Sequence, residues 1–173
     1  APVVADRATP TDLKRGIQEA NVSFCAPMQL YHGVASRLLD TGSDCLFLPM
    51  LCSLPSSGGE PHAVTCPIVQ ASADLLRSDL GSRATTVISP VIRFGIEGCR
   101  SELFRQSCRD LASELGAVDR FVPAFEAAVR LQTQFEQTCK QIGERALAYC
   151  REQGLPPVVV LGRPYTLHNT VLN

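Results

Sequence analysis

The sequence has little of what marks several protein classes. It contains no tryptophan and only two methionines, and 16 lysines and arginines nearly balance 17 aspartates and glutamates, for a formal net charge of −1. Without a basic excess, the chain offers no electrostatic surface for nucleic acid or an anionic membrane, so neither is expected as a partner. No apolar run approaches the ~20 residues that a membrane-spanning helix needs.

Several motifs are also missing. The sequence has no G-x-G-x-x-G, no Walker A motif and no nucleophile elbow, which argues against a phosphate-loop ATPase or a serine hydrolase. The first residues lack the apolar region of a signal peptide, so we expect a cytoplasmic protein. The chain starts without methionine, and residues 170–173 resemble the start of an unfinished element. We therefore interpret it as a piece of a larger protein that is not catalytic on its own.

What is present is enough apolar sequence for a core. Apolar residues make up 45% of the chain, and 173 residues fit one domain or slightly more. Strand candidates at 22–24, 45–48 and 85–88 alternate with helical patterns, a loop covers 49–61, and helix starts stand at Pro27 and Pro67. This alternation predicts an α/β fold with a parallel sheet covered by helices on both faces, in a Rossmann-like arrangement.

The domain organisation follows from the same patterns. Residues 1–19 form an N-terminal helix, with Thr9 as N-cap, Pro10 in the first turn and Asp12 just after it. Residues 20–116 form the α/β lobe. Residues 117–155 form one long connecting helix of ~50 Å, in which Phe125, Phe135 and Ile142 are expected to be buried. Residues 156–173 begin a second, truncated α/β lobe, whose first strand is the apolar run at 158–161.

Eight cysteines stand at positions 25, 45, 52, 66, 99, 108, 139 and 150, with no C-x-x-C pair. That spacing argues against a zinc ribbon or a thioredoxin-type site, and disulfides are rare in a reducing cytosol. Cys25 and Cys66 stand at predicted helix starts, and Cys52 and Cys99 follow the second and third strands. Loops after parallel strands share the carboxyl edge of a sheet, so these thiols are candidate metal ligands on one rim. Packing is the alternative, and it is the expected role of the cysteines at 45, 108, 139 and 150.

Other polar residues could also bind a ligand. His32 lies two helical turns after Cys25 and faces either this rim or solvent, and Gly33 beside it indicates close approach of another backbone. Arg163 follows the last strand and suits a phosphate or carboxylate, unless it pairs with an acidic neighbour. Tyr165, His168 and Asn169 follow, and Asn169 is also a good N-cap.

Four segments resemble one family. Residues 23–33 match S-x-C-x-P-x-x-L-x-H-G, residues 44–49 match D-x-x-F-x-P, residues 66–69 match C-P-x-V, and residues 162–165 match G-R-P-Y. These motifs resemble large proteins related to the activators of 2-hydroxyacyl-CoA dehydratases. Some relatives carry a cysteine where this chain has Met50.

The resemblance implies a function. Such proteins join ATPase modules of the acetate kinase/Hsp70-like type to a domain similar to dehydratase subunits, which hold [4Fe–4S] clusters through cysteines. It therefore implies a [4Fe–4S] cluster on Cys25, Cys66 and Cys52, with a role in ATP-driven electron transfer for acyl-CoA dehydration. The implied partners are the ATPase modules of the parent protein and a dehydratase subunit. Two alternatives stay open: a non-catalytic docking module, or an acyl-CoA or small-molecule binding lobe that uses Arg163.

Overall fold

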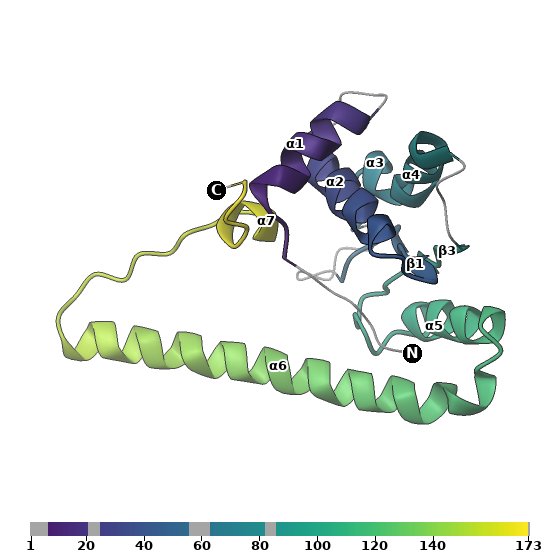
Figure 1. Cartoon of the computed structure of the whole chain (residues 1–173). Helices are drawn as coiled ribbons and strands as arrows, with labels where there is room; N and C mark the ends of the chain where they lie inside the picture. The colour runs from purple at the N-terminus through teal and green to yellow at the C-terminus, as the bar shows by residue number, and fades with distance from the viewer. Residues whose placement is uncertain (1–6, 21–24, 56–62, 82–85, 173) are drawn as a thin grey trace.

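The computed structural model describes residues 7–20, 25–55, 63–81 and 86–172 (Figure 1). They form a lobe of helices and short strands, and one long helix that runs along a side of it. No helix among these residues is both long enough and apolar enough to cross a membrane. The elements are α1 (Pro10–Glu19), α2 (Ala26–Asp40), β1 (Cys45–Phe47), β2 (Met50–Leu51), α3 (Pro67–Gln70), α4 (Ser72–Leu80), β3 (Thr86–Ile88), β4 (Val91–Ile92), α5 (Glu102–Glu114), α6 (Val118–Glu152) and α7 (Pro164–Leu167).

The strands form two small parallel sheets. β1 pairs with β3, which confirms the predicted parallel pairing of those segments, and β2 pairs with β4. β2 lies in a segment predicted to be a loop. The strand predicted at 22–24 lies outside the described residues.

The two sheets are consecutive parts of one ribbon. Partners are 41 residues apart in both, because Cys45 faces Thr86 and Met50 faces Val91. At the same offset Pro49 faces Pro90. Pro90 has no N–H to donate to the Leu48 carbonyl, so the ladder is interrupted between the sheets. The ribbon continues on either side, where the N–H groups of Leu48, Met50 and Cys52 donate to carbonyls of the other segment.

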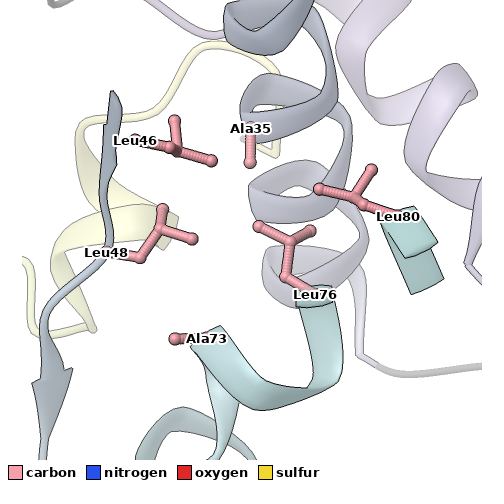
Figure 2. Packing of buried hydrophobic residues seen from close by; sticks show 6 residues of the cluster. All are labelled: Ala35, Leu46, Leu48, Ala73, Leu76 and Leu80. Carbon is pink, nitrogen blue, oxygen red and sulfur yellow. The ribbon is translucent and has the colours of Figure 1, made fainter. Parts of the chain in front are cut away.

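The core lies on one face of β1. Leu46 of β1 and Leu48 just after it pack against small and branched side chains of α2 and α4 (Figure 2). The cluster consists of Ala35, Leu46, Leu48, Ala73, Leu76 and Leu80.

The opposite face of β1 is open. Cys45 and Phe47 are exposed there, because they alternate with the buried Leu46. The prediction of helices on both faces is therefore wrong for β1. α5 contacts β4, where the Ser107 hydroxyl accepts a hydrogen bond from the Arg93 N–H at 3.2 Å. The fold is thus mixed α/β, and its two-stranded sheets do not establish a Rossmann-like order.

Two glycines let α1 and α2 cross in backbone contact. A Cβ on Gly16 would stand 1.7 Å from the Gln29 carbonyl oxygen, and one on Gly33 would stand 1.7 Å from the Asp12 carbonyl oxygen. Any side chain at either position would overlap the other helix. The close approach predicted at Gly33 is confirmed, and its partner is α1.

Asp12 ties the start of α1 to α2. Its side chain is 1% exposed; Oδ2 accepts hydrogen bonds from the Thr9 N–H and hydroxyl, both at 2.8 Å, and Oδ1 accepts one from Arg37 Nε at 2.7 Å. The predicted N-cap role of Thr9 is confirmed. Burial alone would raise the pKa of Asp12, but the hydrogen bonds from Arg37 and Thr9 outweigh it and lower the pKa below its ordinary value of 3.8.

α6 confirms the long helix but not its expected burial. It runs unbroken for 35 residues, including through Gly143. Phe121 is buried and Phe125 half-buried, whereas Phe135 is 63% and Ile142 52% exposed. The prediction that Phe135 and Ile142 are buried is wrong, because α5 lies alongside only the N-terminal part of α6.

The strand predicted at 158–161 is also wrong. These residues are extended but have no strand partner in the described chain, and Val158 and Leu161 are 85% and 88% exposed. Their apolar, β-branched pattern favours a strand only where a neighbouring strand can pair with it. The segment instead carries the chain from the end of α6 back toward the lobe, where α7 lies (Figure 1).

The glycine crossing predicts a large effect of one methyl group. Gly33→Ala should lower the free energy of unfolding by about 2–3 kcal/mol, because backbone atoms of α1 must move away. The matched control is Gly143→Ala, where nothing lies within 4 Å and the helix is exposed; it should stabilise the helix by about 0.5–1 kcal/mol. Denaturant unfolding followed by circular dichroism measures both. A Gly33→Ala protein as stable as the wild type would contradict the crossing.

The Asp12 carboxylate predicts a stability that depends on pH. Because its pKa is lower in the folded state than in the unfolded state, it stabilises the fold above its unfolded value, and that stabilisation is lost as pH falls through the lowered folded value. Asp12→Asn should cost about 1–3 kcal/mol at neutral pH, and the difference between variant and wild type should shrink below about pH 4. Urea midpoints measured across this range test it; a difference that stays constant with pH would contradict it.

Candidate functional site: a thiol edge

Cys25 stands at the N-cap of α2. Its carbonyl accepts hydrogen bonds from the N–H groups of Met28 and Gln29, and Pro27 occupies the first turn, where no N–H is needed. The side chain is exposed and makes no capping hydrogen bond. The thiol is therefore held at the positive end of a 15-residue helix, where a negatively charged ligand is favoured.

Cys66 and Cys52 are joined through the backbone of Thr65. Cys66 is the N-cap of α3 and is exposed. The residue before it, Thr65, donates its N–H to the Cys52 carbonyl at 3.1 Å and its hydroxyl to the Leu51 carbonyl. Cys52 thus leaves β2 beside the chain that leads into Cys66.

Arg163 brings the C-terminal segment to the same place. Its guanidinium donates a hydrogen bond to the Tyr165 hydroxyl at 2.6 Å, which raises the pKa of Arg163, and the negative charges that Cys66 and Cys25 carry as thiolates act in the same direction. Both cysteines are therefore within electrostatic range of one exposed cation. The acidic partner considered for Arg163 is not found among the described residues. We call Cys25, Cys52, Cys66 and Arg163 the thiol edge.

The thiol edge is not a closed metal site. Among the described residues, no group of three histidines, cysteines, aspartates or glutamates is placed to hold a metal ion. The predicted ligands are brought to one side of the lobe, but their sulfurs do not surround a common point. Thiols are the right donors for an iron–sulfur cluster, yet the set is incomplete in this arrangement.

Other predicted ligand residues have different surroundings. His32 is buried, with Nε2 3.4 Å from Asp79 Oδ2, so it joins α2 to α4 instead of facing a ligand. The Asn169 Oδ1 accepts hydrogen bonds from the N–H groups of Val171 and Leu172, which is the capping geometry predicted for it. His168 is exposed after α7.

The remaining cysteines fall into two groups. Cys45 and Cys139 are exposed, so the prediction that they fill the core is wrong. Cys99, Cys108 and Cys150 are half-buried, and burial raises the pKa of the Cys99 and Cys108 thiols.

A groove between α5 and α6 was not anticipated. It has a volume of about 420 Å³ and an almost entirely apolar lining that includes Phe104, Cys108, Phe121, Ala124 and Ala128. The sequence signal for this groove was its four phenylalanines: Phe94 stacks on Phe104, and the Phe104 and Phe121 rings each contact Phe125 at a tilt.

Comparison with known proteins identifies the family. The family model described as CoA enzyme activase uncharacterised domain (DUF2229) matches residues 1–173. Neither the curated proteins nor the solved structures contain a match. The match covers the whole chain and agrees with the resemblance carried by the four motifs, so the chain belongs to the CoA enzyme activase uncharacterised domain family.

Proposed function

We propose that the thiol edge binds an iron–sulfur cluster and that this domain supports ATP-driven electron transfer for acyl-CoA dehydration. One observation carries the proposal: Cys25 and Cys66, separated by 40 residues, both interact electrostatically with the exposed Arg163 guanidinium. Family membership supports a role with CoA enzymes. The proposal concerns the domain within its parent polypeptide, whose ATPase modules and a dehydratase subunit are the proposed partners.

The chemistry of the residues supports this choice of cofactor. Thiolates are the usual ligands of iron–sulfur clusters, and Cys25 and Cys66 are both exposed. Cys52 is the proposed third ligand, and solvent or a partner residue completes the set. When bound, such a cluster supplies one-electron transfer.

The surroundings of Cys25 and Arg163 favour a negatively charged cluster. The α2 helix start holds Cys25 in place and favours the negative charge of a thiolate-bound cluster. The Arg163 guanidinium complements the same charge, and the Tyr165 hydroxyl orients it at 2.6 Å. Because no group of three donors closes around a metal in the part of the chain that the structure describes, the proposal requires the three thiols to come closer together when the cluster binds.

Anaerobic reconstitution with ferrous iron and sulfide tests the proposal. The wild-type chain should take up about four irons and develop broad visible absorption, since a [4Fe–4S] cluster needs three or four thiolates. The double variant Cys25→Ser, Cys66→Ser should lose both the iron and the absorption. Iron and sulfide analysis, with Mössbauer or EPR spectra of the reduced sample, identifies the species bound.

The matched control removes two cysteines outside the thiol edge. Cys45→Ser, Cys139→Ser removes the same number of exposed thiols, and its iron uptake should equal that of the wild type. If both double variants lose iron equally, the uptake is non-specific and the proposal is wrong. Equal uptake by the wild type and the Cys25, Cys66 variant would also contradict it.

A further inference from the structure

One straight stripe on α6 is apolar and exposed. Ala124, Ala128, Leu131, Phe135, Ile142 and Tyr149 recur at intervals of three, four and seven residues, which places them along one side of a helix. All six are exposed although they include four large apolar or aromatic side chains. We call these six residues the α6 stripe.

The N-terminal half of the α6 stripe borders a hollow, whereas the C-terminal half carries projecting side chains. Ala124 and Ala128, in the N-terminal half, line the groove between α5 and α6. Ile142 and Tyr149, in the C-terminal half, project from a helix that no other described segment covers. Phe135 lies between the hollow half and the projecting half.

We propose that two copies of this chain associate along the α6 stripe, with their α6 helices antiparallel. In this arrangement Phe135 packs against Phe135 of the partner subunit at a two-fold axis. Residue 142 lies seven positions after 135 and residue 128 lies seven before it; residues 149 and 121 are related in the same way at fourteen positions. The two-fold axis therefore places Ile142 and Tyr149 of each copy in the groove of the other copy. Such an interface is isologous, as in most soluble dimers.

The shapes favour antiparallel over parallel pairing. A parallel pair would place groove against groove and leave the projecting side chains facing each other. Antiparallel pairing fills both grooves, as ridge-into-groove packing requires. A cavity of about 150 Å³ accommodates a benzene ring, so the groove of about 420 Å³ has room for the aromatic ring of Tyr149 and the branched side chain of Ile142.

Burial of apolar side chains drives this association. Four large apolar or aromatic side chains of the stripe are exposed, and their removal from water on pairing is favourable. Because the interface rests on one helix of each copy, we expect an affinity in the micromolar range.

Sedimentation velocity of the 173-residue chain tests the proposal. Between about 1 and 200 µM, a range that brackets micromolar affinity, the mass should rise from that of one chain to that of two. Phe135→Glu, Ile142→Glu should keep the chain a monomer throughout, with unchanged circular dichroism. The matched control Gln137→Glu, Lys140→Gln changes the net charge by the same two units on the opposite face of α6, where both side chains are exposed, and should still form dimers.

Disulfide cross-linking tests the orientation. Residues 128 and 142 are about 21 Å apart along one helix, so a disulfide in the variant Ala128→Cys, Ile142→Cys that joins these two positions must connect two copies. Mild oxidation followed by peptide mass spectrometry should find this 128–142 pair. Links of 128 to 128 and 142 to 142 would indicate parallel helices and overturn the proposal. A wild-type chain that stays monomeric at every concentration, or a dimer that survives Phe135→Glu, Ile142→Glu, would also overturn it.

Discussion

The crossing of α1 and α2 is the constraint on which the lobe depends. Gly16 and Gly33 allow the two backbones to touch, and Asp12 and Arg37 close the same contact with a buried hydrogen bond. Once α2 is fixed in this way, one of its ends presents Cys25 and its middle supplies Ala35 to the core under β1. The position of the Cys25 thiol therefore depends on the helix contact at Gly33, two turns away, which is itself only a packing contact.

The strand ribbon supplies the other half of the thiol edge. Its parallel register is interrupted where two prolines face each other, and β2 resumes just before Cys52. The hydrogen bond from Thr65 to Cys52 then leads the returning chain to Cys66. Three segments of the lobe thus converge without any local sequence motif that joins them, and Arg163 reaches the same place from beyond α6.

Local signals in the sequence predict local structure well. The N-cap at Thr9, the prolines at the starts of α2 and α3, and the glycine contact at Gly33 are all confirmed, because each depends on backbone sterics or on a hydrogen bond within a few residues. Family membership, predicted from four motifs, is confirmed as well.

Burial and pairing are where prediction fails, because they depend on the partner. The apolar spacing on α6 gives the correct helix, but it does not say that α5 covers only the N-terminal part of it and leaves Phe135 and Ile142 exposed. Likewise 158–161 has strand composition but no described neighbour. The groove between α5 and α6 arises from the packing of two helices, which periodicity of either one alone does not reveal.

Proximity of the Cys25 and Cys66 thiols is the central claim, and a short bifunctional thiol reagent measures it most directly. The reduced chain is treated with a short-span bismaleimide, digested with a protease and analysed by mass spectrometry. This treatment should recover a pair of peptides linked through Cys25 and Cys66. The account predicts that this pair dominates over links from either thiol to the exposed Cys45 or Cys139. Single modification of both Cys25 and Cys66 without a link between them, while other pairs do form, would contradict it.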